Sequence, residues 1–250
     1  DTIPFKPLKQ FTGKATPVTV KRVDTNGTEV TATYTPNVTK VTPTSTPATS
    51  SGPQGVPQTG TPVFKEGDPA VPIDYNKQMT FDNDQSKKIV AGVGEYTINS
   101  DGSITFTPEK QYVGTPTPVT VKRVDKNGTP VTAKYTPTVI PVSPSGEDVT
   151  SVGPKNTPQE GTPTFKGGKV TVNGEEKTVE IDEDKPAKLV DPKTGDPVDS
   201  VTIEGEGTYT VAPDGTVTFT PEKNFTGKGT GVTVQREDKN GTPVKATYTP

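Results

Sequence analysis

The sequence has no cysteine, no histidine and no tryptophan, and it has a single methionine. Without cysteine, the chain can form neither disulfides nor a thiolate zinc site. Without histidine, it lacks the side chain that most often acts as a base, proton shuttle or metal ligand near neutral pH. Disulfide-stapled folds and histidine-based catalysis are therefore excluded.

Leucine is also scarce, whereas valine and threonine are abundant. The 250 residues include 2 leucines and 31 valines. Because β-branched residues suit pleated strands and leucine suits helices, this composition predicts an all-β protein. Hydrophobic residues make up only 26% of the chain, but the net charge of −3 is small and apolar and polar residues alternate regularly. Most of the chain is therefore expected to fold rather than to be disordered.

Long apolar runs and basic clusters are missing as well. No segment is apolar and long enough to span a membrane, and no signal peptide is present. No basic patch with interleaved aromatic residues occurs, so neither nucleic-acid binding nor membrane insertion is predicted. The abrupt start and end of the chain suggest a piece of a larger protein.

The chain repeats itself. The segment "VTVKRVDTNGTEVTATYTP" begins at Val18, and close copies begin at Val119 and Val232, which are spaced by 101 and 113 residues. A unit of about 100 residues is domain-sized, which favours separate domains over a solenoid. We predict that residues 1–42 are the C-terminal part of a repeat and that residues 43–141 are a complete β-sandwich repeat. Residues 142–250 are predicted to be a second complete repeat with an extra loop near 191–200.

The segments between the repeated units align as well. "FDNDQSKKIV" from Phe81 matches "IDEDKPAKLV" from Ile181, which places an insertion of about a dozen residues after Val190 and before Gly205. The Pro/Thr/Ser-rich stretches between units predict extended, semi-rigid connections. These stretches match in register, so part of each is expected to dock as the first strand of the domain that follows.

The dipeptide Asn127-Gly128 suggests a two-residue hairpin turn. That turn would pair Val121 with Lys134 and break the apolar face, whereas a three-residue loop pairs Val121 with Ala133. The sequence therefore predicts a type I turn in which Asp125 holds the first position and Gly128 the left-handed fourth position. The same requirement for a three-residue loop, which keeps apolar residues on one face, predicts pairing of Tyr96 with Phe106 and of Tyr209 with Phe219.

Two such hairpins per repeat, with short strands near Phe165, Val170–Val172 and Val179–Ile181, give about seven strands. Turn signals recur about every ten residues, which is typical of tandem antiparallel β-sandwich domains of Ig-like or cadherin-like type. Short Pro/Thr-rich linkers are expected to join them. Residues 1–41 contain only one hairpin, and a lone hairpin is marginal in water. We expect this hairpin to be ordered only if another chain or domain completes it.

Several segments are similar to a known family. "GPQGVPQTGTPVF", "GEGTYTVAPDGTVTFTPEKNFTG" and "REDKNGTPVKATYTP" resemble the fibrillar stalk repeats of CshA-type Gram-positive, cell-wall-anchored surface adhesins of streptococci and their relatives. The resemblance implies a long extracellular fibril that projects a distal domain for host attachment, biofilm formation or coaggregation. It implies that neighbouring repeats of the same chain are partners. Host matrix such as fibronectin would be bound through other regions of the full protein.

Acidic pairs are the strongest metal candidates. Asp82 and Asp84 align with Asp182 and Asp184, and such pairs can bind calcium between cadherin-like domains. Calcium needs six to eight oxygen ligands, and the sequence offers two or three, so a solvated turn is favoured. "DKNG" departs from an EF-hand loop because its glycine is fourth rather than sixth. We predict no metal and no cofactor.

Catalytic readings find little support. Asp191, Asp196 and Asp199 could supply a glycosidase pair, but nothing else suggests a sugar cleft. No nucleophile motif is present, so we predict that the protein is not an enzyme. An isopeptide crosslink would need Lys, Asn and an acidic residue, which are too common here to be diagnostic.

Arginine recurs at one position of the repeat, as Arg22, Arg123 and Arg236. A ligand site is one reading, but we favour aliphatic stems that cover the rim of the core while the charge stays in water. Two functions remain open from the sequence. The repeats are either a structural stalk or weak binding modules that act through many copies.

Overall fold

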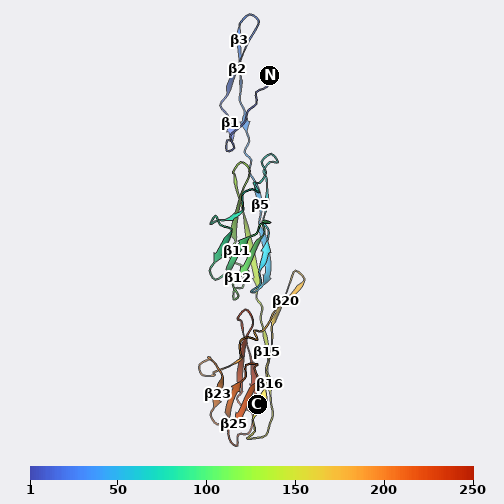
Figure 1. Cartoon of the computed structure of the whole chain (residues 1–250), viewed down its shortest axis with the longest axis vertical. Coiled ribbons are helices and arrows are strands. Elements are labelled where there is room, and N and C mark those ends of the chain that lie inside the picture. The colour runs from blue at the N-terminus through green and yellow to red at the C-terminus, as the bar shows by residue number, and fades with distance from the viewer.

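The computed structural model describes all 250 residues, and they form strands and loops without a helix. No helix is therefore available to cross a membrane. The molecule is elongated, with an isolated hairpin at the N-terminal end followed by two sandwich domains along the long axis (Figure 1). We call these parts the first, second and third repeats.

The first repeat is a pair of small two-stranded sheets. Its strands are β1 (Gly13–Lys14), β2 (Val18–Val23), β3 (Glu29–Tyr34) and β4 (Asn37–Val38), with β1 paired to β4 and β2 to β3. Val20 is 39% exposed and Val30 is 62% exposed, although their counterparts Val121 and Val131 are buried in the second repeat. The hairpin thus shows an uncovered core face, and its completion by another chain or domain remains a prediction.

The second repeat has two four-stranded sheets and one extra strand pair. The sheets run β10-β11-β12-β7 and β6-β14-β13-β9, and β5 pairs with β8. The strands are β5 (Thr44–Thr46), β6 (Ala48–Pro53), β7 (Gln58–Gly60), β8 (Val63–Lys65), β9 (Thr80–Phe81), β10 (Lys87–Val90), β11 (Gly94–Ile98), β12 (Ile104–Pro108), β13 (Val119–Val124) and β14 (Pro130–Ile140).

The third repeat follows the same plan with additions. Its sheets run β16-β27-β26-β21-β22 and β17-β25-β24-β23, with the pairs β15–β18 and β19–β20 beside them. The strands are β15 (Ser145–Glu147), β16 (Val149–Thr150), β17 (Gln159–Gly161), β18 (Thr164–Lys166), β19 (Gly168–Val172), β20 (Glu175–Val179), β21 (Lys188–Val190), β22 (Pro197–Val198), β23 (Ser200–Ile203), β24 (Gly207–Val211), β25 (Val217–Pro221), β26 (Val232–Glu237) and β27 (Pro243–Thr249).

One pairing in each of the second and third repeats is parallel, whereas all other strand pairs are antiparallel. Strand β6 pairs in parallel with β14, and β16 with β27. As expected, the linker before each repeat thus supplies a docked first strand. The chain enters each repeat at one end and leaves at the other, so its first and last strands run in the same direction (Figure 1).

Each core is built around a small aromatic cluster. In the second repeat, Tyr96 lies 4.6 Å from Phe106 and 6.1 Å from Tyr135 between ring centroids, and all three are fully buried. The third repeat has the equivalent cluster of Tyr209, Phe219 and Tyr248. These few large side chains compensate for the scarcity of leucine, because each aromatic ring buries a large apolar area.

The predicted hairpin registers are confirmed. Val121 pairs with Ala133, Tyr96 with Phe106, and Tyr209 with Phe219. The N–H of Gly128 donates to the carbonyl of Asp125 at 2.9 Å, and Gly128 has a φ of 83°. The loop therefore has the left-handed fourth residue that a three-residue connection requires.

The predicted alignment of Phe81 with Ile181 is wrong. Ile181 bridges Asp238 as Ile73 bridges Asp125, whereas the partner position of Phe81 is filled by Leu189. Apolar residues recur eight positions apart in both repeats, at Ile73 and Phe81 and at Ile181 and Leu189. The sequence alignment therefore matched Ile181 with Phe81 instead of with Ile73, which lies one strand earlier. Asp182 is consequently the counterpart of Asp74, and the pair Asp82 and Asp84 does not recur.

The extra length of the third repeat therefore lies in two places rather than one. Part of it builds the β19–β20 hairpin, which precedes the position of Ile181. The remainder makes the turn at residues 191–196, where the N–H of Gly195 donates to the carbonyl of Asp191 at 2.7 Å. Pro197–Val198 and Ser200 belong to β22 and β23, so only the first half of the predicted loop is irregular.

Candidate functional site: the junction between the second and third repeats

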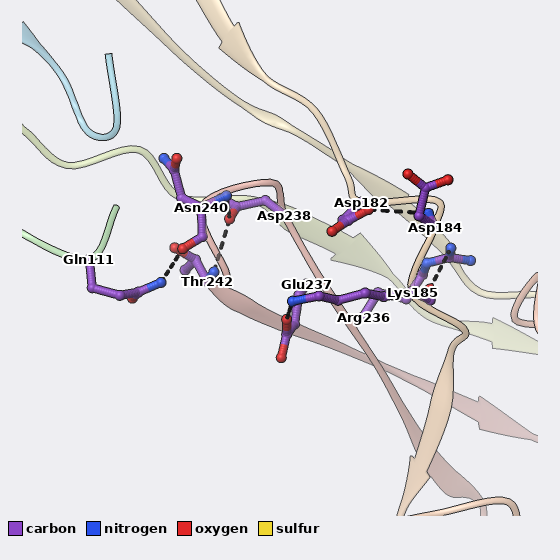
Figure 2. A network of polar contacts seen from close by, with 9 residues as sticks. All are labelled: Gln111, Asp182, Asp184, Lys185, Arg236, Glu237, Asp238, Asn240 and Thr242. Atoms are coloured by element: carbon purple, nitrogen blue, oxygen red, sulfur yellow. Dashed lines mark hydrogen bonds and ion pairs between the residues drawn. The ribbon is translucent and has the colours of Figure 1, made fainter. Parts of the chain in front are cut away.

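The Asn-Gly turn has the same internal structure in all three repeats. In the third repeat, Asp238 Oδ1 accepts the N–H groups of Asn240 and Thr242, each at 2.9 Å, as Figure 2 shows. Asp24 and Asp125 make the corresponding bonds in the other repeats. An Asp that bonds the backbone two residues on stabilises a turn locally, so this geometry follows from the sequence alone.

The surroundings of the three turns differ. Asn26 is exposed, Asn127 is half-buried, and Asn240 is only 8% exposed. A loop tip on a hairpin is normally open to solvent. The burial of Asn240 therefore indicates a contact made by the end of the preceding repeat.

The second repeat holds Asn240 from two sides. The Asn240 side-chain amide donates to the carbonyl of Gln54 at 2.9 Å. The Gln111 side-chain amide donates to the carbonyl of Asn240, as Figure 2 shows. Gly55 adjoins the same amide. We call Gln54, Gly55 and Gln111 the Asn240 seat. The Gln54 carbonyl and the Gln111 amide each form a hydrogen bond with Asn240, as polar groups in a buried contact usually do.

Hydrogen bonds to Lys110 of the second repeat and to Val142, which follows the last strand of that repeat, fix the Gln54 side chain. Its amide nitrogen donates to the carbonyl of Lys110 at 2.8 Å, and its amide oxygen accepts the N–H of Val142 at 3.3 Å. Because these bonds tie together three separate segments, the carbonyl of Gln54 is held in place for the incoming turn. The contact is therefore preorganised on the side of the second repeat.

At the junction between the first and second repeats, one of these two hydrogen bonds is also present. The Gln10 side-chain amide donates to the carbonyl of Asn127, as Gln111 does to Asn240. Gln10 and Gln111 are 101 residues apart, and Asn127 and Asn240 are 113 apart, which are the two repeat spacings. The recurrence of these Gln and Asn residues is visible in the sequence. Its meaning depends on the structure, which shows that the turn faces the preceding repeat.

The β19–β20 hairpin extends past the junction toward the second repeat (Figure 1). A cleft of about 490 Å³ lies between this hairpin and residues 49–59, lined by Ser50, Gln58, Asn173 and Lys177 among others. Ligand pockets are mostly apolar, and this cleft is mostly polar. We therefore interpret it as the space between two abutting domains.

The acidic candidates form ion pairs and turns. Asp82 pairs with Lys88 at 2.7 Å, and Asp84 with Lys122 at 2.9 Å. The hydrogen bond from Lys88 holds the pKa of Asp82 below its usual value. Asp182 Oδ1 accepts the N–H of Asp184 (Figure 2). No group of three or more acidic, His or Cys side chains is placed to hold a metal ion.

The three aspartates considered as a glycosidase pair also form ion pairs or turn hydrogen bonds. Asp199 pairs with Lys188 at 2.7 Å, and Asp191 Oδ1 accepts the N–H of Lys193 at 2.8 Å. Asp196 closes the same turn, because its carbonyl accepts the N–H of Asp191 at 2.9 Å. No lysine in the chain is buried, so none has the dry surroundings that an isopeptide crosslink would need.

The three recurring arginines have different surroundings. Arg22 is exposed beside Asp1, and the Arg123 guanidinium lies 4.9 Å from the ring centre of Tyr75. Arg236 departs from the expectation that the charge stays in water, because its side chain is 5% exposed and pairs with Glu183 at 3.0 Å. Nearby, a hydrogen bond from Lys185 to Glu237 raises the pKa of Lys185 (Figure 2).

These features define a class of protein. The chain is a tandem array of β-sandwich repeats whose specific contacts lie between neighbouring repeats, without a metal-binding cluster. The model of the surface adhesin CshA repetitive domain matches residues 1–38, 40–139 and 141–250. The chain therefore belongs to this family of surface adhesin repeats, whose place is the outer surface of the cell.

The chain is also similar to solved structures. The chain is 61% identical to repeat domain 13 of the fibrillar adhesin CshA from Streptococcus gordonii, over 28% of this chain and 90% of that one, with a TM-score of 0.17. It is 13% identical to mouse cadherin-23 EC22-24, over 93% and 71% of the two chains, with a TM-score of 0.32. No curated protein matches. The sandwich fold is defined by the sheets described above rather than by these overall likenesses.

Proposed function

We propose that this chain is a stalk segment of a cell-wall-anchored fibrillar adhesin. In this role it holds a distal binding domain away from the bacterial surface for host attachment, biofilm formation or coaggregation. The observation that carries the proposal is the seated turn, in which Asn240 contacts Gln54 and Gln111 of the preceding repeat. A domain that only tethered its neighbours would have no need of a preorganised contact at its end.

The path of the chain suits this role. Each repeat is entered at one end and left at the other, and the parallel pairs β6–β14 and β16–β27 join the entering strand to the leaving one. A pull along the fibril therefore loads strands that are hydrogen-bonded side by side. Each domain of about 100 residues adds roughly 30–40 Å of reach.

The proposal includes the absence of catalysis and places binding of host matrix such as fibronectin in other regions of the full protein. The partners of the segment itself are then the neighbouring repeats of the same chain. In support, the candidate carboxylates Asp82 and Asp199 pair with lysines, and the cleft at the junction is polar.

Bacterial display of one distal binding domain on arrays of different length tests this function. We expect adhesion under flow to rise with the number of repeats, while the affinity of the distal domain stays constant. The 250-residue chain alone should not bind immobilised fibronectin at micromolar concentration. Binding by the chain alone would instead support the alternative, in which the repeats are weak multivalent modules.

A further inference from the structure

The second and third repeats present different residues at the end that faces a following repeat. By the repeat spacings of 101 and 113, the third repeat has Lys155, Asn156 and Asn224 where the Asn240 seat has Gln54, Gly55 and Gln111. The surrounding strands are equivalent in both repeats. At these three positions the two repeats therefore carry different residues beside equivalent strand pairs.

Gly55 is the position at which a side chain would matter most. Its φ is +79°, and a Cβ at this position would overlap Oδ1 and Cγ of Asn240. Asn240 cannot retreat freely, because its amide nitrogen donates to Gln54 and its carbonyl accepts from Gln111. The seat therefore exists because residue 55 has no side chain.

Asn156 has the side chain that Gly55 lacks. Its φ of 62° shows the same left-handed backbone, which asparagine tolerates better than most residues. Its Oδ1 accepts the N–H of Asn224 at 2.7 Å. In the third repeat, the side chain of Asn156 thus makes a hydrogen bond within its own repeat. It stands at the position where the second repeat contacts Asn240.

We infer that the residue at this position selects the type of junction. Glycine leaves an open seat, and the Asn-Gly turn of the following repeat locks into it. Asparagine fills the seat from within, so the following repeat is joined by the linker alone and the fibril bends there. The fibril would then contain stiff and bending junctions at positions set by this one residue. The biological meaning rests on the proposed stalk function, but the effect on the junction does not.

The substitution Gly55→Asn in the full chain tests this inference, because it places the third repeat's residue on the second. Gly92→Asn is the matched control, since Gly92 has a φ of +75° and open space around it. The chain has no cysteine, so Ile89→Cys and Thr210→Cys provide two unique spin-label sites, one in each repeat. We expect one narrow distance distribution in the parent and the control, and a broad one in Gly55→Asn.

Deamidation gives a second readout at the turn itself. The nitrogen of the following glycine attacks the asparagine side-chain carbonyl, ammonia leaves, and water opens the resulting ring to aspartate or isoaspartate. The three Asp-x-Asn-Gly turns, which contain Asn26, Asn127 and Asn240, share the same internal bonds, so Asn26 is an internal reference. We expect deamidation to be about tenfold slower at Asn240 than at Asn26, a factor equal to about 1.4 kcal/mol. Gly55→Asn should bring the two rates together.

The outcomes separate the inference from the stalk proposal. Asn240→Ala should broaden the label distances as Gly55→Asn does, because both variants remove the contact between Asn240 and the seat. An unchanged distribution and an unchanged Asn240 rate in a folded Gly55→Asn protein would overturn the inference and leave the stalk intact. Unfolding of the second repeat by Gly55→Asn, but not by Gly92→Asn, would also overturn it, because the third repeat's residue should fit this backbone.

Discussion

Two equivalent tyrosines should respond in opposite directions to loss of their hydroxyl groups. Tyr96 and Tyr209 lie 113 residues apart at the same place in the two cores, and both are fully buried. The hydroxyl of Tyr209 accepts the N–H of Gly231 at 3.1 Å, whereas that of Tyr96 has no partner. The counterpart of Gly231 is Pro118, which has no N–H to donate.

The expected magnitudes follow from this difference. A buried polar group without a partner costs about 1–3 kcal/mol, so Tyr96→Phe should raise the free energy of unfolding of the second repeat by about 1 kcal/mol. Tyr209→Phe removes a neutral hydrogen bond and should lower that of the third repeat by about 0.5–1.5 kcal/mol. For a domain of about 100 residues, 1 kcal/mol shifts the melting temperature by roughly 4–8 °C.

Differential scanning calorimetry of the full chain can measure both changes, because each variant should move only the transition of its own repeat. Tyr135→Phe is a control in the second repeat, since the Tyr135 hydroxyl bonds Ser50 and its loss should destabilise. The reasoning would be refuted if Tyr96→Phe lowered the melting temperature as much as Tyr209→Phe does.

Three further predictions concern both cores and the whole chain. Burial raises the pKa of Tyr209 to about 12 and also raises the pKa of Tyr135 and Tyr248. The pKa of an unfolded tyrosine is about 10, so between about pH 10 and 12 the unfolded state releases protons that the folded state keeps. The free energy of unfolding should therefore stay constant up to about pH 9 and fall above about pH 10. A melting temperature that stays constant up to about pH 12 would contradict this. Gly60→Ala should destabilise the second repeat by about 1–3 kcal/mol, because its Cβ would overlap the ring of Tyr135, whereas Gly92→Ala meets only a backbone penalty of about 1 kcal/mol. The intact mass should equal the sequence mass, since no lysine is buried for a crosslink, and loss of one ammonia would prove otherwise.

The hairpins were predictable from the sequence because an odd number of loop residues is needed to keep the apolar side chains on one face. Val121 had to pair with an apolar residue, and only a three-residue loop with Gly128 in the left-handed position allowed it. The docked first strand also followed from the matching linkers, but its parallel direction did not. That direction depends on where the chain enters and leaves the domain, which no local pattern encodes.

The misplaced alignment at Ile181 has a different cause. Ile73 and Phe81 both precede an aspartate, so Ile181 could match either one by sequence. Only the backbone bonds from Asp74 to Val124 and from Asp182 to Glu237 show which position is equivalent. The seat was hidden for a related reason, since Gln54, Gln111 and Asn240 are far apart in sequence and meet only when two domains stand end to end.

Small-angle X-ray scattering of the 250-residue chain tests the central claim most directly. A compact domain of this length has a radius of gyration of about 18 Å. Repeats that stand end to end with Asn240 in its seat should give a radius of gyration clearly above that value and the scattering profile of a rod. A radius of gyration near 18 Å, with the profile of a globular particle, would contradict the account of this chain as a stalk.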